Sequence, residues 1–137
     1  MCGIAGYVGD RESADVLVDA LSKLEYRGYD SAGIAVFDHG NIKVKKCKGR
    51  LANLVEKMDE EGKPQGHVGI GHTRWATHGE PSDINSHPHG NKRVTIVHNG
   101  IIENYKKLKD FLVGEGYSFA SETDTEVAAK LLDYYYD

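Results

Sequence analysis

Hydrophobic side chains along the chain recur with two different periods, one typical of strands and one typical of helices. Residues 4–8 form a short apolar run between Gly3 and Gly9, which predicts a buried strand. From residue 13 onward, apolar side chains recur every three or four positions, which predicts an amphipathic helix that ends near Gly28. The chain is therefore expected to begin with a strand followed by a helix.

The next predicted unit is a β-hairpin. Residues 33–37 and 42–47 flank Asp38-His39-Gly40-Asn41, a turn-rich tetrapeptide between two strand-like runs. Two further core strands are predicted at residues 67–72 and 93–98, and a long polar stretch separates them. Because long loops between strands often carry function, this stretch is a candidate location for a site.

Helical spacing returns in the second half of the chain. Apolar residues within 51–58 predict a helix that ends at Gly62-Lys63-Pro64, and those within 105–112 predict another that ends at Gly114 or Gly116. Residues 117–119 are predicted to form a short strand.

The last predicted helix starts at a capping box and runs to the end of the chain. Thr123 and Glu126 have the spacing of that motif, and an apolar stripe continues behind them without a stop signal. We therefore expect residues 1–137 to be a piece of one longer domain. The mixture of strands and helices predicts an α+β fold.

Composition narrows the class of protein. A chain of 137 residues and 15.1 kDa fits a single domain, and a net charge of −4 gives no broad basic surface, so nucleic acid is not an expected partner. No run approaches the roughly 20 apolar residues that span a bilayer, and no signal segment opens the chain. Two cysteines cannot form a disulfide framework. These observations predict a cytoplasmic protein that does not bind membranes.

Cys2 is the most informative candidate for chemistry. Removal of Met1 would leave a thiol and a free α-amine on one residue, so that nucleophile and base are neighbours. An α-amine titrates near pH 7.7–8.0, so a useful fraction can accept the thiol proton at neutral pH. The alternative is that Cys2 is only a small apolar residue at the start of a strand.

Polar residues elsewhere could complete such a site. Asn99-Gly100 offers a side-chain amide and an unhindered backbone N–H for an oxyanion, although Asn-Gly is also a favoured hairpin turn. The segment 73–79 places a guanidinium, a hydroxyl and an imidazole after a predicted strand, and a guanidinium matches a carboxylate. Asp124 could face an ammonium group or simply cap its helix. Together these groups could hold an amino acid by both charged ends.

The seven histidines raise a competing hypothesis. His87-Pro88-His89, with other histidines nearby, could suggest the metal site of a hydrolase, but no His-Glu-x-x-His or paired Cys-x-x-Cys motif accompanies it. Loop hydrogen bonding is the simpler interpretation. The glycine-rich motifs that bind phosphate are also missing. We therefore expect neither a metal nor a cofactor.

Five motifs together resemble one known family. They resemble the N-terminal class II glutamine amidotransferase (glutaminase) domain of the glutamine-fructose-6-phosphate aminotransferases (isomerising), or glucosamine-6-phosphate synthases, and the match runs in order along essentially the whole chain. The motifs are Cys2-Gly3-Ile4, Glu25-Tyr26-Arg27-Gly28-Tyr29-Asp30-Ser31-Ala32-Gly33, His72-Thr73-Arg74-Trp75-Ala76-Thr77-His78-Gly79, His98-Asn99-Gly100-Ile101-Ile102-Glu103-Asn104 and Ser121-Glu122-Thr123-Asp124-Thr125-Glu126.

The resemblance implies a fold and a set of residue roles. The fold is the N-terminal-nucleophile (Ntn) hydrolase sandwich, in which two antiparallel sheets lie between helical layers in the order αββα, here incomplete. Cys2 would attack the γ-amide of glutamine and form a γ-glutamyl thioester. The other roles implied are an oxyanion hole at Asn99 and Gly100, α-carboxylate binding by Arg74, Thr77 and His78, α-ammonium binding by Asp124, a gate at Trp75, and a supporting wall of Arg27 and Tyr29.

The resemblance also implies partners and leaves two alternatives open. Glutamine would be the substrate, fructose 6-phosphate would be met only through an isomerase domain that this chain lacks, and the parent enzyme would be a homo-oligomer. If Met1 is retained, the nitrogen of Cys2 is an amide and cannot act as a base, and the fragment would bind glutamine or glutamate without turnover. A metal-dependent hydrolase is the other alternative.

Overall fold

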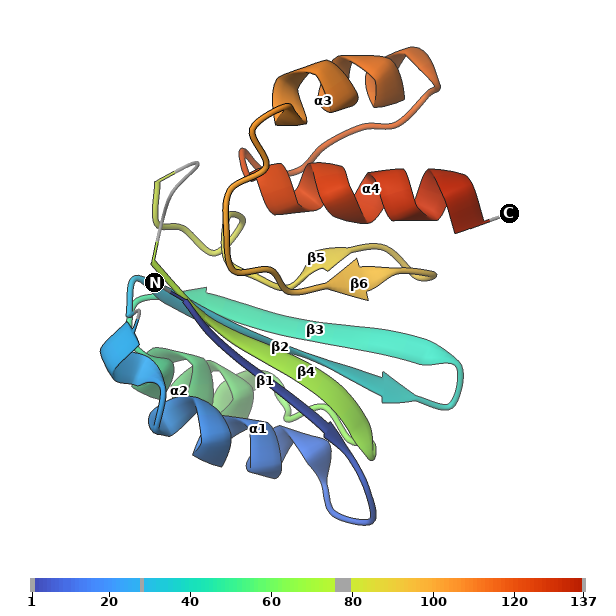
Figure 1. Cartoon of the computed structure of the whole chain (residues 1–137). Coiled ribbons are helices and arrows are strands. Elements are labelled where there is room, and N and C mark those ends of the chain that lie inside the picture. The colour runs from blue at the N-terminus through green and yellow to red at the C-terminus, as the bar shows by residue number, and fades with distance from the viewer. Residues whose placement is uncertain (1, 28, 76–79, 137) are drawn as a thin grey trace.

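The computed structural model describes residues 2–27, 29–75 and 80–136, which form six strands, four α-helices and one short 3-10 helix. The elements follow the chain in the order β1 (Gly3–Val8), α1 (Ser13–Ser22), η1 (Glu25–Arg27), β2 (Ser31–Asp38), β3 (Asn41–Lys48), α2 (Leu51–Glu61), β4 (Val68–Arg74), β5 (His89–Gly90), β6 (Thr95–Ile96), α3 (Tyr105–Gly114) and α4 (Asp124–Tyr136). Figure 1 gives their arrangement.

The larger sheet is antiparallel, with strand order β1-β4-β2-β3. Strand β4 lies in the middle, and its His72 is paired with Ile4 on β1 and Gly33 on β2. The predicted hairpin is present: β2 and β3 pair from Ser31↔Lys48 to Asp38↔Asn41. Both turn residues have positive φ, 49° at His39 and 85° at Gly40, as expected for a type I′ turn.

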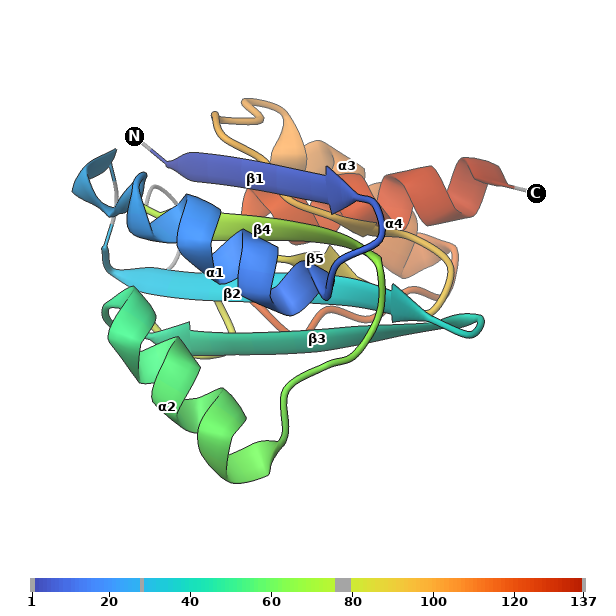
Figure 2. The same ribbon diagram turned by 90° about the horizontal axis from the view of Figure 1, so that it is seen from below.

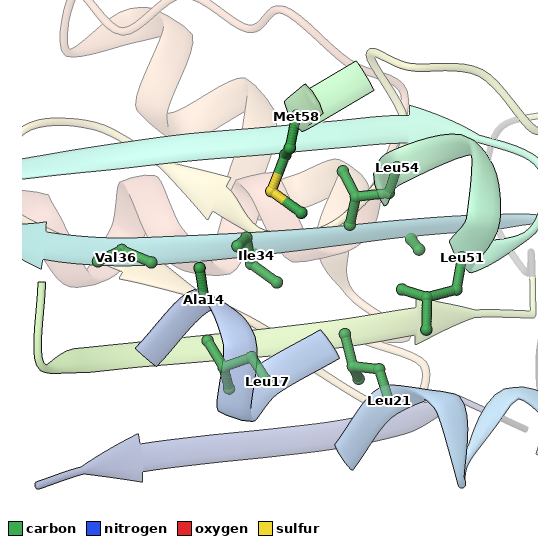
Figure 3. Close-up of a cluster of buried hydrophobic side chains, with 9 residues drawn as sticks. Ala14, Leu17, Leu21, Ile34, Val36, Leu51, Leu54 and Met58 are labelled. Atoms are coloured by element: carbon green, nitrogen blue, oxygen red, sulfur yellow. The ribbon is translucent and has the colours of Figure 1, made fainter. Parts of the chain in front are cut away.

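The main core lies between this sheet and helices α1 and α2, which cover the same face (Figure 2). Leu17 and Leu21 of α1 lie over Gly69 and Gly71 of β4, where a Cβ would come within 2.8 and 3.0 Å of their methyl carbons. These two glycines let the helix approach the sheet closely, since any side chain would push it away. The cluster in Figure 3 comprises Ala14, Leu17, Leu21, Ala32, Ile34, Val36, Leu51, Leu54 and Met58.

The opposite face of the sheet is only partly covered. The second sheet consists, within the described residues, of the two-residue strands β5 and β6, and α4 and α3 lie beyond it (Figure 1). The layers therefore follow the order αββα, which confirms the predicted α+β class and the incomplete sandwich. Apolar side chains remain exposed on the uncovered face, including Phe37 and Val68, which line a hollow of about 280 Å³ together with Ala35, Ile42, Gly69, Ile70 and Thr95.

Three sequence predictions need correction. Residues 117–119 form no strand, because the Tyr117 amide donates to Leu112 O and its hydroxyl to Asp133, which holds this segment against the helices. The strand predicted at 93–98 is only Thr95–Ile96. The first helix ends at Ser22, and η1 follows before position 28.

The predicted capping box at α4 forms in a modified way. The Thr123 hydroxyl accepts the N–H of Glu126 at 3.3 Å, as predicted for an N-cap. The Glu126 carboxylate accepts the N–H groups of Ala120 and Ser121, at 3.0 and 2.7 Å, so it binds the chain that leads into the helix. Both contacts fix the start of α4. None of the helices in the described part of the chain has the length and apolar character needed to cross a bilayer.

Candidate active site

Cys2 lies just before β1 and is 8% exposed. Its Sγ accepts the N–H of Trp75 at 3.2 Å, so the strand end that carries Trp75 lies directly beside the thiol. The N–H of Cys2 donates to Oδ1 of Asn99 at 3.3 Å, and Nδ2 of Asn99 donates to the carbonyl of Cys2 at 3.4 Å. Residues that are 73 and 97 positions away in the sequence thus contact Cys2, Trp75 at its sulfur and Asn99 at its backbone.

The environment of Cys2 keeps its thiol protonated at neutral pH. Burial raises the pKa of the Cys2 thiol above its usual value, and the hydrogen bond from the Trp75 amide opposes this effect only in part. A nucleophile must nevertheless lose its proton when it attacks. A thiol in this state could act as a nucleophile only with a base within reach.

A cavity of about 210 Å³ opens at the sulfur. This volume is smaller than the roughly 300–1,000 Å³ of sites for drug-sized ligands, so it suits a molecule of amino-acid size. Its lining includes the predicted site residues Cys2, Arg74, Trp75, Asn99, Gly100 and Asp124. The lining residues are Cys2, Arg74, Trp75, His87, His98, Asn99, Gly100, Ile101, Asp124 and Thr125.

Two buried side chains give the cavity opposite charges. Arg74 ends β4 and is 2% exposed, and Asp124 begins α4 and is 3% exposed. Burial lowers the pKa of the Arg74 guanidinium, while Asp30 favours its charged form, and a guanidinium stays protonated at neutral pH in either case. One Asp124 oxygen accepts the N–H of Ile102 at 2.8 Å. A zwitterionic ligand would match this pair of charges.

Asn99 and Gly100 lie in an irregular segment at the mouth of the cavity. Residues 97–102 form neither helix nor strand, and Asn99 and Gly100 are exposed to solvent. Gly100 has a φ of +154°, and a Cβ there would come within 3.2 Å of the His98 ring, so glycine suits the position. The structure thus brings together Cys2, Asn99 and Gly100, as the sequence predicted.

The predicted gate and wall residues are partly described. Trp75 is 52% exposed, and Tyr29 meets it edge to face with ring centroids 6.3 Å apart. The guanidinium of Arg50 lies 4.7 Å from the Tyr29 ring centroid. Arg27 is the last residue of η1, but its side chain lies outside the described part of the structure, as do Thr77 and His78 entirely.

Three buried histidines form a cluster beside the cavity. The rings of His72 and His87 stack at 3.9 Å and 10°, and His89 meets His87 edge to face at 4.8 Å. Burial lowers the pKa of His72 to about 4 and that of His89 to about 3, so both are neutral at pH 7. Stacked rings present faces and not ring nitrogens to one another. Among the described residues no group of three His, Cys, Asp or Glu side chains could hold a metal.

Sequence reasoning missed the residues that join the long loop to α4. The side chain of Asn85 is buried; it accepts the N–H of Glu122 at 2.8 Å and donates to Glu80 O at 2.9 Å. His89 bonds the hydroxyl of Thr123 at 3.0 Å. No local pattern marks Asn85, since its partners lie up to 37 positions away.

Comparisons with known proteins agree with this geometry. Residues 58–135 match the family described as glutamine amidotransferase domain. The chain is 63% identical to a glutamine-fructose-6-phosphate aminotransferase (isomerizing) of Clostridium tetani over 99% of the chain, and 53% identical to that of Pyrococcus horikoshii over 97%. It spans only about a fifth (22%) of each relative's length.

Solved structures of related enzymes share the fold. The glutamine phosphoribosylpyrophosphate amidotransferase of B. subtilis in complex with ADP and GMP superposes with a TM-score of 0.80 and 28% identity, covering 97% of this chain and 29% of that one. A structure described as the allosteric regulatory enzyme of purine biosynthesis gives a TM-score of 0.81 and 29% identity over the same shares. This likeness confirms the Ntn hydrolase fold. With a family match over more than half its length, the chain belongs to the glutamine amidotransferase domain family.

Proposed function

We propose that this chain carries the site that hydrolyses glutamine in a glutamine-fructose-6-phosphate aminotransferase. The observation that supports this proposal is that the buried thiol of Cys2 shares one small cavity with the buried guanidinium of Arg74 and the buried carboxylate of Asp124. Arg74 would bind the α-carboxylate of glutamine and Asp124 its α-ammonium, which leaves the side-chain amide directed at the sulfur. Thr77 and His78 are proposed to assist Arg74.

The proposed reaction begins with proton transfer inside one residue. After removal of Met1, the α-amine of Cys2 takes the proton of its own thiol, directly or through a water molecule. The sulfur attacks the γ-carbonyl carbon, and the C=O electron pair moves to oxygen. Asn99 Nδ2 and the backbone N–H of Gly100 donate to that oxyanion. Asn99 Oδ1, now 3.3 Å from the nitrogen of Cys2, would accept a hydrogen from the freed amine and hold it beside the sulfur.

The second half of the reaction releases both products. The ammonium form of the Cys2 amine returns its proton to the leaving nitrogen, so the C–N bond breaks and ammonia departs. The γ-glutamyl thioester remains. The amine then takes a proton from water, whose oxygen attacks the thioester. The C–S bond breaks, the sulfur takes that proton back from the amine, and glutamate is released. Trp75, at the cavity mouth, is proposed to gate the exit of ammonia, and Tyr29 and Arg27 are proposed as parts of the supporting wall of the site.

The acceptor of ammonia lies in the parent protein, beyond this chain. The relatives' name supports fructose 6-phosphate as that acceptor, and we propose glucosamine 6-phosphate as the product; this chain spans only 22% and 23% of the length of two such relatives. We propose a cytoplasmic location, because a reducing compartment keeps a nucleophilic thiol such as Cys2 free. The net charge of −4 supports the absence of nucleic acid among its partners. Homo-oligomerisation of the parent stays a prediction.

The test uses the natural-length protein with its N-terminal residue identified by mass spectrometry. Cys2→Ala should abolish release of glutamate from glutamine, whereas Cys47→Ser, which changes the half-buried second thiol on β3, should retain wild-type turnover. A chelator should have no effect. Glutamate release by Cys2→Ala, loss of wild-type glutamate release on chelation, or tight glutamine binding without turnover would refute the proposal, and the last outcome would support the silent alternative.

A further inference from the structure

The ring of His72 links the nucleophile strand to the segment that carries the oxyanion donors. His72 lies on β4, paired with Ile4 of β1, two positions after Cys2. Its side chain is fully buried and points into the layer between the two sheets, where it stacks on His87. None of the roles assigned above to glutamine hydrolysis uses this ring.

The hydrogen bond of His72 defines its tautomer. Nε2 lies 2.9 Å from the carbonyl oxygen of His98, and a carbonyl can only accept, so Nε2 carries the hydrogen. Because burial keeps the ring neutral, Nδ1 is the unprotonated nitrogen. Nδ1 is buried and has no hydrogen-bond partner among the residues that the structure describes. The ring therefore acts as a single donor aimed at His98.

The segment that receives this bond depends on side chains for its position. Residues 97–102 have no strand or helix bonds of their own. His72 holds the carbonyl of His98 at one end, and Asp124 holds the N–H of Ile102 at the other. Asn99 and Gly100 lie between these two anchors. A change at either anchor should move both oxyanion donors together.

We propose that His72 is a positioning residue for glutamine hydrolysis, whose Nε2–H···O bond to His98 sets the distance from the Asn99 and Gly100 donors to the Cys2 sulfur. This inference rests on the proposed function. His72 does not touch the substrate in this scheme. It acts through the main chain of His98, at the residue immediately before the oxyanion donors.

The expected effect is on turnover more than on binding. Misplacement of catalytic groups by about 1 Å costs on the order of 10²-fold in rate. His72→Leu should therefore lower kcat by about 10- to 100-fold, below the loss of about 10²- to 10³-fold for removing an oxyanion donor outright. The KM for glutamine should change little, because Arg74 and Asp124 remain in place.

Two further variants separate positioning from general destabilisation. His72→Gln keeps an N–H donor at similar reach and should recover most of the lost kcat. Leu54→Ala removes a buried side chain of α2 on the far side of the large sheet, so it should lower the unfolding midpoint and leave kcat unchanged. The rate of Cys2 alkylation by iodoacetamide should be unchanged in Leu54→Ala, because that variant leaves the hydrogen bonds of Cys2 with Asn99 and Trp75 intact.

Crystal structures of the natural-length wild-type and His72→Leu proteins give a readout that is independent of activity. We expect Asn99 to shift relative to Cys2 in His72→Leu, with loss of the 3.3 Å contact between Cys2 N and Asn99 Oδ1. An unmoved Asn99, or a Gln variant as slow as the Leu variant, would overturn the inference. If the wild-type protein releases no glutamate, the proposed function fails, and the position of Asn99 still decides whether His72 holds this segment.

Discussion

Gly33 is the position where one added carbon should disturb the site most directly. It lies on β2, opposite His72, and the backbone of His87 crosses directly above it. A Cβ built on Gly33 would lie 1.9 Å from the carbonyl oxygen of His87 and 2.9 Å from its carbonyl carbon. Since real Cβ contacts stay beyond 3.0 Å, the His87 carbonyl must retreat by about 1 Å or more.

The expected loss of stability and activity follows from the contacts that a shift of the His87 carbonyl would disturb. His87 stacks on His72 and lines the cavity at Cys2, so Gly33→Ala changes packing and site together. Overpacking a tight core costs about 1–3 kcal/mol, and a shift of about 1 Å near reacting groups costs on the order of 10²-fold in rate. We expect a lower urea midpoint together with a kcat/KM for glutamine reduced by about that factor.

Gly114→Ala is the matched control. Gly114 ends α3, and a Cβ there meets nothing within 4 Å. Alanine favours the helix by up to about 1 kcal/mol, so this variant should keep or raise the urea midpoint with unchanged kinetics. If Gly33→Ala matches Gly114→Ala in both unfolding and kcat/KM, the tight contact with His87 is absent and the reasoning is refuted.

Three other changes have defined outcomes. Asn99→Ala should lower kcat by about 10²- to 10³-fold with little change in KM, measured by glutamate release; a threefold effect would contradict the oxyanion role. Burial lowers the folded-state pKa of His89 to about 3, below its unfolded value of about 6.5. The free energy of unfolding, measured by urea titration, should therefore fall as the pH drops from about 6.5 to about 3. In His89→Gln this fall should be less steep. Hydrogen bonds from Arg93 and Tyr117 hold the pKa of Asp133 below its usual range. The contribution of Asp133 to the free energy of unfolding is therefore present above about pH 4 and lost under more acidic conditions. Asp133→Asn should remove that part of the acid dependence.

Local patterns predicted the elements whose partners lie close in sequence. The hairpin of β2 and β3 appears because its turn residues are adjacent, and α2 ends at Gly62 because that residue adopts a φ of +103°. The strand predicted over 93–98 is shorter for the opposite reason. The carbonyl of its last residue, His98, is held by His72 from the distant strand β4, and no alternation of apolar residues encodes such a bond.

Candidate site residues could be predicted from the sequence where the chemistry of the side chain itself distinguishes them. Cys2, Asn99, Arg74 and Asp124 stood out by type and position, and the structure brings them to one cavity. The hydrogen bond that Asp124 accepts from the Ile102 amide could not be predicted, because it depends on how the segment after Gly100 folds back on α4.

The carboxylate of Asp124 also has a consequence for selectivity. One of its oxygens holds residues 97–102 in place by accepting the N–H of Ile102, and the same carboxylate is proposed to bind the ammonium of glutamine. An amide that lacks this ammonium would not make that contact, at the point where residues 97–102 are anchored. Analogues without the ammonium should therefore be cleaved more slowly as well as bound more weakly. A substitution of Asp124 that changes the affinity for glutamine should also change its turnover.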